Sequence, residues 1–264
     1  MPETRRKSSL PKRVPQSPVV PADCAQCQIH DKTVCRPFQG PTLHVVQDFK
    51  LGDRVLPAGS QIFWPEQELS EVYNLLDGWV SLYRSLPSGR RQIVDIALPG
   101  SFLGYQPDLE APMLHGAECL TDVAVCVFPR KAFDRLAKQY PSLSLQLAKV
   151  TAQSVIRTQG HLANVGSRPA LIRVARLLCE ILYRLDKSPR RVAETVEIPL
   201  TQTHVGEALG LTNVYVNMTL RELRERGVLI FKGGRLTVLD PDRLVQLAEF
   251  EPETAAYEWA DPVS

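Results

Sequence analysis

The sequence predicts an α+β protein with an N-terminal antiparallel β-roll, a long helix and a C-terminal winged helix-turn-helix. Short apolar runs of period two, separated by Gly and Pro turns, indicate the β-roll. A run with apolar residues every three or four positions indicates the helix. Two short helical patterns around a glycine, followed by paired glycines between apolar runs, are typical of a winged helix. In chain order we expect a disordered basic arm (1–22), a cysteine-rich segment (23–40), the β-roll (41–130), the long helix (131–165), the winged helix (166–240) and a C-terminal helix with an acidic tail (241–264).

Length, composition and charge limit the class of protein. The 264 residues, 44% of them hydrophobic, suffice for two globular domains with short tails. The net charge of +2 does not by itself require a nucleic-acid partner, but basic residues gather in the arm and between residues 168 and 235. Apolar runs are too short to cross a membrane, and prolines follow the basic N-terminus where a signal peptide has its apolar core. We therefore expect a cytoplasmic protein whose cysteines serve as thiols, metal ligands or redox sensors more often than as disulfides.

The segment from Asp23 to Gly40 carries a specific chemical pattern. Cys24, Cys27 and Cys35 follow one another with C-x2-C-x7-C spacing. A C-x2-C pair on a tight turn brings two sulfurs close enough to share a metal, and soft thiolates favour iron-sulfur clusters or zinc. A loop of clustered thiols without metal is the alternative interpretation.

A fourth ligand would come from elsewhere in the chain. Cys126, in the strand-like run 122–128, is the first candidate, and Cys119 and His30 are the alternatives. Cys179 lies in an apolar helical run (171–185), where a cysteine is usually a small core residue.

Between Phe49 and Phe128 the apolar residues alternate with polar ones in short runs. Turn signals such as Asp77-Gly78 separate the runs, so we expect an antiparallel barrel or roll. We also expect its aromatic residues, Trp64 and Trp79 among them, to lie in the core. Such a roll commonly encloses a small ligand, but no cluster of charged residues indicates one here. The expected strands include residues 62–64, 72–76, 79–83, 92–96 and 122–128.

From Lys131 to about Ala163 the pattern predicts one long helix that is interrupted only near its start, by Pro141. Its apolar stripe can pack on the roll of the same chain or against the same helix of a second copy. A hinge is expected at residues 166–169, with the next helix beginning at Ala170. The apolar residues of the stripe are Leu143, Leu147, Ala148, Val150, Ala152, Val155 and Leu162.

The stretch from Leu200 to Ile230 has the layout of a helix-turn-helix. Thr201 is expected to cap the first helix, and Gly210 to end it in a left-handed turn that glycine adopts cheaply. The second helix begins at Thr212. The residues expected to face inward are Val205, Ala208 and Leu209 in the first helix and Val216, Leu220 and Leu223 in the second.

The outward face of the second helix is the candidate surface for the major groove of DNA. Two helix caps, arginines beyond the apolar stripe and a Gly233-Gly234 hairpin favour this surface over an ordinary helical hairpin. We therefore expect binding to double-stranded DNA, and a parallel homodimer through the long helix because such proteins dimerise to contact successive major grooves. The expected DNA-binding residues are Thr212, Asn213, Val214, Tyr215, Asn217, Met218, Arg221, Arg224, Lys232 and Arg235.

These residues divide by the contact that their chemistry allows. Asn213 or Asn217 can bond adenine edges, Tyr215 a base or a phosphate, and Val214 or Met218 can touch thymine methyl groups. The remaining basic residues are expected to bind phosphates, which fixes register without reading sequence: Arg221, Arg224, Lys232 and Arg235.

The order of β-roll, long helix and winged helix resembles the CRP/FNR superfamily of bacterial transcription regulators, whose roll is of the cyclic-nucleotide-binding type. The resemblance covers roughly Cys24 to Leu239 and rests on residues 77–83, 88–93, 98–104 and 200–230. The cysteine pattern resembles the FNR and FixK branch. This resemblance implies RNA polymerase as a partner and an oxygen-labile 4Fe-4S cluster on three N-terminal cysteines and one from the roll, here Cys24, Cys27, Cys35 and Cys126.

The chain departs from the best-known FNR proteins in two ways. Its third cysteine is more widely spaced, as in regulators of the FixK and FnrN kind. Its second helix carries Val214, Asn217 and Met218 where many members place Glu and then Ser-Arg, so the FNR operator is not expected. Cyclic AMP is not expected as a ligand, because the stretch 104–112 lacks the family's basic partner and places Asp108 and Glu110, without a compensating cation, where the phosphate would lie.

Two other functions remain as alternatives. One is a regulator of the same fold with structural zinc on the same cysteines, or with no metal, that responds to another small ligand. The other is a heme or small-ligand sensor that uses His30, His44 or His115. An enzyme is not expected, because the sequence offers neither a nucleophile-base pair nor a phosphate-binding glycine loop.

Overall fold

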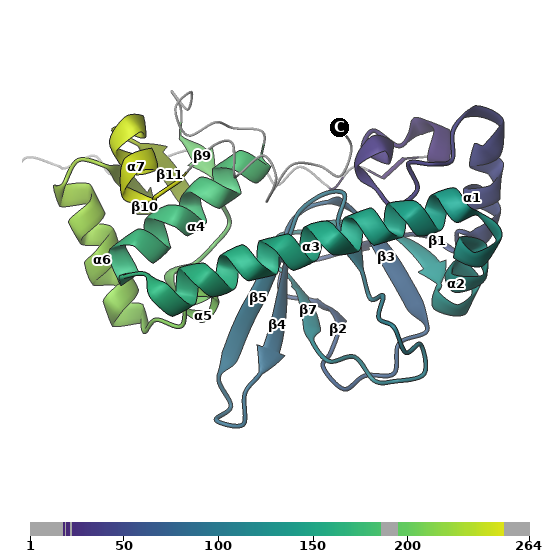
Figure 1. Cartoon of the computed structure of the whole chain (residues 1–264), viewed down its shortest axis with the longest axis horizontal. Coiled ribbons are helices and arrows are strands. Elements are labelled where there is room, and N and C mark those ends of the chain that lie inside the picture. Colours follow the sequence, from purple (N-terminus) through teal and green to yellow (C-terminus); the bar gives the residue numbers. More distant parts are fainter. Residues whose placement is uncertain (1–17, 19, 22, 186–194, 251–264) are drawn as a thin grey trace, which may run out of the picture.

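The computed structural model describes residues 18, 20–21, 23–185 and 195–250. Figure 1 shows a long helix, α3 (Pro141–Ser167), that crosses the molecule. The β-strands of the roll lie along its middle, the winged helix at one end and the cysteine-rich segment at the other (Figure 1). The predicted acidic tail beyond residue 250 and nearly all of the predicted basic arm lie outside the described residues.

The predicted antiparallel barrel or roll is a roll that consists of two four-stranded sheets. One sheet has the order β1-β8-β3-β6 and the other β2-β7-β4-β5. Strand β8 lies inside the first sheet, so six of its seven residues are buried. The strands are β1 (Gly52–Leu56), β2 (Gln61–Phe63), β3 (Glu71–Asp77), β4 (Val80–Ser85), β5 (Arg91–Ala97), β6 (Phe102–Leu103), β7 (Gly116–Cys119) and β8 (Val123–Pro129).

Two features near the strand ends differ in how well the sequence predicted them. Gly78 makes the turn from β3 to β4 with φ of 88°, and a Cβ there would collide with the backbone oxygen of Asp122. Trp79 is partly buried, but the prediction for Trp64 was wrong, because its side chain is 59% exposed. Trp64 directly follows β2, an edge strand of its sheet, where one side has no neighbouring strand.

The predicted interruption at Pro141 is complete and separates two helices. Helix α2 (Arg130–Gln139) ends before Tyr140, whose backbone is extended, and Pro141 begins α3. A proline forces the preceding residue out of helical geometry but suits the first position of a new helix. Helix α3 continues through Ser167, so the break before α4 is confined to Arg168 and Pro169 and is shorter than the predicted hinge.

The cysteine-rich segment consists of short turns and leads into one helix. Three 3-10 turns, η1 (Cys24–Gln26), η2 (His30–Lys32) and η3 (Gly40–Thr42), precede α1 (Leu43–Phe49). The segment packs on the roll and on the start of α3, because Val34 and Phe38 share one apolar cluster with Phe128 and Leu143.

The winged helix has the predicted elements and one additional strand. Thr201 caps α5 by accepting from the backbone N–H of His204, and Gly210 ends it with φ of 66°. Gly233 and Gly234 both have positive φ and join β10 to β11 in a two-residue turn. The short strand β9 pairs with β11 and was not predicted. The elements are α4 (Ala170–Arg184), β9 (Val196–Glu197), α5 (Gln202–Leu209), α6 (Asn213–Glu225), β10 (Leu229–Lys232), β11 (Arg235–Val238) and α7 (Pro241–Leu247).

Candidate DNA-binding surface and cysteine site

Helix α6 presents the predicted face to solvent. Its inner stripe, Val216, Leu220 and Leu223, is buried in the core of the winged helix. Thr212 caps the helix by accepting from the backbone N–H of Tyr215 at 3.2 Å. All ten residues predicted to bind DNA are exposed, and even the apolar Val214 and Met218 are 71% and 62% exposed. Large apolar side chains left in water on a helix that is otherwise well packed indicate a surface that a partner covers.

The polar residues of this face make weak contacts within the chain. Asn213 donates to Thr203 Oγ1 at 3.1 Å, and Asn217 donates to Gln202 Oε1 at 3.3 Å. Arg221 forms an ion pair with Glu225 at 2.7 Å, with both side chains mostly exposed. Exchanging such exposed contacts for contacts to a ligand costs little.

The turn of the wing concentrates positive charge. Lys232 and Arg235 occupy directly paired positions on β10 and β11, and both are exposed. Like charges on paired strand positions repel each other. Glu197 of β9 lies opposite Arg235 on its other side and offsets part of this repulsion. Two exposed cations at the turn are still the arrangement expected of a wing that touches phosphates.

The four predicted ligand cysteines gather at one place. Cys35 and Cys126 are buried in one apolar cluster, and Cys24 and Cys27 pack against it. Asn74, also buried, lies opposite Cys126 in the pairing of β3 and β8 and donates to Cys35 Sγ at 3.2 Å. By contrast, Cys119 lies on β7 in a different apolar cluster, and Cys179 is buried in the core of the winged helix, as expected.

A buried ion pair adjoins the cysteines. Lys50 Nζ lies 2.7 Å from Asp53 Oδ2, and the two side chains are only 4% and 13% exposed. Asp53 is the β1 residue opposite Cys126. The positive charge of Lys50 acts to lower the pKa of Cys24, Cys27 and Cys126.

Burial nevertheless dominates the chemistry of these thiols. Desolvation raises the pKa of Cys24, Cys27 and Cys126, and raises that of Cys35 to about 12. Without a metal, the thiols are therefore protonated and neutral at pH 7. Binding to a metal would require them to deprotonate.

The donor chemistry fits a thiolate-bound metal, although the arrangement is not that of a closed site. Four soft sulfur donors share one cluster, and the buried Oδ1 atoms of Asn74 and Asp53 have no hydrogen-bond partner among the described residues. A cavity of about 630 Å³ adjoins Cys27 and the 3-10 turns. Within the described residues, no three His, Cys, Asp or Glu side chains lie at metal-binding spacing, so the 23–35 turns would have to shift to complete a site.

The three histidines named as alternative ligands lie in different parts of the structure and do not form one site. His30 is next to the cysteines, and its Nδ1 lies 3.4 Å from Asp31 Oδ1. The Nδ1 of His44 donates a hydrogen bond to the carbonyl oxygen of Pro41. The ring of His115 packs edge-on against the ring of Phe63. Glu110, expected to lack a compensating cation, has one, because it pairs with Lys131 at 2.7 Å.

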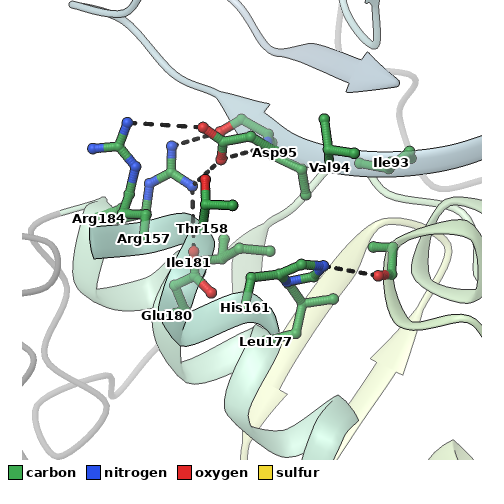
Figure 2. Close-up of a pocket in the computed structure, with 12 residues that line it drawn as sticks. Ile93, Val94, Asp95, Arg157, Thr158, His161, Leu177, Glu180, Ile181 and Arg184 are labelled. Carbon is green, nitrogen blue, oxygen red and sulfur yellow. Dashed lines mark hydrogen bonds and ion pairs between the residues drawn. The ribbon is translucent and has the colours of Figure 1, made fainter. Parts of the chain in front are cut away.

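The roll and the winged helix meet at a polar junction below the end of α3, shown in Figure 2. Asp95 of β5 pairs with Arg184 of α4 at 3.3 Å and with Arg157 of α3 at 3.8 Å. Arg184 also reaches Glu180 at 3.5 Å, and burial raises the pKa of that carboxyl. The adjoining cavity, about 20 Å³, has room for a single water-sized molecule, and the ion pairs around it join the roll to the winged helix.

A β-roll joined by one long helix to a winged helix with an outward second helix defines a transcription regulator of the helix-turn-helix class. The sequence matches the "Cyclic nucleotide-binding domain" family over residues 53–140 and the "Crp-like helix-turn-helix domain" family over residues 172–247. In the described part of the chain, no helix combines the length and apolar character that a membrane span requires.

Comparison with known proteins indicates the same class of transcription regulator. The nitrogen fixation regulation protein FixK of Bradyrhizobium diazoefficiens is 31% identical over 226 residues, which cover 85% of this chain and 93% of that protein. The transcriptional activator protein FnrL of Cereibacter sphaeroides is 26% identical over 88% of this chain and 94% of its own. The structure of FixK2 from Bradyrhizobium japonicum superposes with a TM-score of 0.66 and 27% identity, covering 74% of this chain and 96% of FixK2. The chain belongs to the CRP/FNR family of transcription regulators, in the branch that resembles FNR and FixK.

Proposed function

We propose that the protein is a homodimeric, cytoplasmic DNA-binding regulator that senses oxygen or redox state through a 4Fe-4S cluster on Cys24, Cys27, Cys35 and Cys126. The observation that carries the proposal is the gathering of these four sulfurs in one apolar cluster between the N-terminal turns and β8. The relatives support it indirectly, since FixK and FnrL are named for nitrogen fixation regulation and transcriptional activation. A bound cluster supplies a centre that oxygen and redox state can alter.

The residues of the chain provide a route from the cysteines to α3. Gln146 of α3 is buried and donates to the carbonyl oxygen of Thr33 at 3.4 Å, two residues before Cys35. The ring of Phe38 lies 5.2 Å from that of Tyr140, which immediately precedes α3. Any rearrangement of the cysteine turns therefore changes the contacts that hold the start of α3. A difference of a few kcal/mol between two such states is enough to shift their populations.

Helix α3 also provides the proposed dimer seam. The predicted apolar stripe divides into two faces, because Leu143 and Leu147 pack on the roll of the same chain. Of the other predicted positions, Val150 is half-buried, while Ala148, Ala152, Val155 and Leu162 are exposed and are spaced by four, three and seven residues, as in a coiled coil. Leu145, which was not part of the predicted stripe, is also exposed and lies three residues before Ala148. Sedimentation of the purified chain tests the dimer.

Residues of α6 and the wing are proposed to contact DNA. Asn213 and Asn217 suit adenine edges, Tyr215 a base or phosphate, and Val214 and Met218 thymine methyl groups. Thr212 begins this face. RNA polymerase is the expected partner on the promoter. The residues proposed to bind phosphates are Arg221, Arg224, Lys232 and Arg235.

The decisive experiment is anaerobic purification followed by iron and sulfide analysis. The expected protein is brown and contains about four iron and four sulfide per chain if each chain holds one cluster. Cys126→Ser should lose this iron, whereas Cys119→Ser should keep it, because Cys119 lies in another apolar cluster. A colourless, iron-free protein that still binds DNA would contradict the cluster. Zinc that survives air and leaves DNA affinity unchanged would instead indicate a structural metal on the same cysteines.

A further inference from the structure

The hairpin formed by β4 and β5 of the roll is fastened to the first helix of the helix-turn-helix. Gln92 of β5 donates to the carbonyl oxygen of Ala208 in α5 at 3.0 Å. Ile93 and Ile96 belong to the same apolar core as α5. Figure 1 shows this hairpin projecting from the sheet next to α5. The hairpin tip therefore has a defined position relative to the DNA-binding helices.

The hairpin tip and the two helices enclose a groove of about 400 Å³. Thr203 in the first turn of α5 and Thr212 and Asn213 at the start of α6 form one wall. In helix-turn-helix proteins the first helix crosses the DNA backbone while the second enters the major groove. The first amides of both helices lack partners within their own helix and suit an anion. The groove thus opens where a DNA strand would pass.

The opposite wall of the groove presents a cation, Arg90, at the hairpin tip. The tip is closed by the backbone N–H of Leu86, which donates to the carbonyl of Arg90 at 2.8 Å. The side chain of Arg90 is exposed and makes no ion pair with any other residue in the described ranges. Its neighbour Arg91 is already engaged, since it pairs with Glu118 and lies 3.7 Å over the ring of Tyr83. Glu207 of α5 also lines the groove and opposes an anion.

We propose that Arg90 binds a DNA phosphate beside each half-site, so that the roll as well as the winged helix touches DNA. The partner is identified by chemistry and by continuity: a guanidinium faces the groove that begins at the first turns of α5 and α6. A contact of this kind fixes the flanking backbone and carries no base specificity. It also makes DNA affinity depend on how the roll is docked against α5.

The test measures affinity for a mixed-sequence DNA duplex as a function of salt, with the full chain and without RNA polymerase. Arg90→Ala should lower affinity about three- to tenfold and reduce the log-log salt slope by about 0.9 for each protomer bound, because one counterion-releasing contact is lost. Arg84→Ala is the matched control: Arg84 is an exposed arginine on the same hairpin that does not line the groove. Its salt slope should stay at the wild-type value. Equal slopes for the two variants would overturn the proposal.

Two further measurements distinguish a DNA contact at Arg90 from a protein contact. Hydroxyl-radical footprinting should show flanking backbone positions that wild type and Arg90→Lys protect and Arg90→Ala does not. Glu207→Gln should tighten DNA binding, because it removes the carboxylate that lines the groove. If Arg90→Ala binds and protects DNA normally but lowers transcription with RNA polymerase, the hairpin contacts a protein and the proposal fails. All variants are compared with wild type in the same metal state, so the difference in salt slope reports on Arg90 whether or not the cysteines hold a cluster.

Discussion

Replacing Asp95 with alanine tests the junction between the roll and the winged helix. The carboxylate contacts Arg184 at 3.3 Å and Arg157 at 3.8 Å. At an effective dielectric constant of about 20, the shorter pair has a gross Coulomb energy of about 5 kcal/mol. Side-chain exposures of 21% and 9% mean that desolvation and solvent screening offset much of it. Arg184 also keeps its bonds to the carbonyl of Ile96 and to Glu180, so it is not left uncompensated.

We therefore expect Asp95→Ala to lower the free energy of unfolding by about 1–2 kcal/mol, which corresponds to a Tm lower by roughly 2–8 °C for a chain of this size. Calorimetry measures the midpoint, and hydrogen exchange should show faster exchange at the amides of β5 and α4. DNA affinity should fall as well, because the winged helix loses part of its attachment to the roll.

The matched control is Glu110→Ala. Glu110 pairs with Lys131 at 2.7 Å, a shorter distance, but the two side chains are 75% and 70% exposed. Exposed pairs contribute about 0–1 kcal/mol, so the midpoint should barely move. If the two variants lose the same stability, or if Asp95→Ala leaves exchange in α4 unchanged, the ion pairs of Asp95 do not hold the domains together.

Two further predictions concern the helix-turn-helix. Asn217→Ala should reduce discrimination at one base pair by about 1–3 kcal/mol. Arg224→Ala should instead weaken binding to all sequences and reduce the salt slope. If the two variants behave alike in a binding-site selection, the division of α6 into base-reading and phosphate-binding residues is wrong. Burial lowers the pKa of His204 from its ordinary 6.5, and its Nδ1 accepts from the N–H of Thr201 at 3.3 Å, so the neutral ring is favoured in the fold. Its contribution to stability is complete above pH 6.5 and is lost as the pH falls through the lower folded pKa. As the pH is lowered from 7 through this range, thermal unfolding should therefore show a larger loss of stability for wild type than for His204→Gln, whose side chain can keep the cap. Parallel losses for the two proteins would contradict this.

The sequence predicted best those features that depend on neighbouring residues. The caps at Thr201 and Thr212 and the left-handed Gly210 are set by local chemistry, and the structure has them. The Gly233-Gly234 turn is equally local. Features that depend on distant pairing were harder to predict. Strands β6 and β9 have two residues each, too few for a period, and the exposure of Trp64 follows from sheet order, which a local pattern does not contain.

The same division applies to the candidate sites. The exposure of the α6 face follows from a helical period and was predicted. The burial of Lys50 with Asp53 was not predicted, because it arises from the pairing of β1 with β8, much further along the chain. Asn74 is placed between Cys35 and Cys126 in the same way. The groove at Arg90 also requires the docking of two domains. For the buried ion pair, the only local signal was the three-residue spacing of Lys50 and Asp53 directly after α1.

The length of α3 gives its contacts at one end a mechanical effect at the other. Its 27 residues form a rod of about 40 Å, with the cysteine turns touching one end and α4 and α5 the other. A tilt of only about 5° at the first end would displace the second by about 3.5 Å, close to the roughly 3.4 Å rise between base pairs. In a dimer, two such arms would have to reach grooves spaced about 34 Å apart. A movement too small to disturb the fold could therefore decide whether both arms meet the DNA in register.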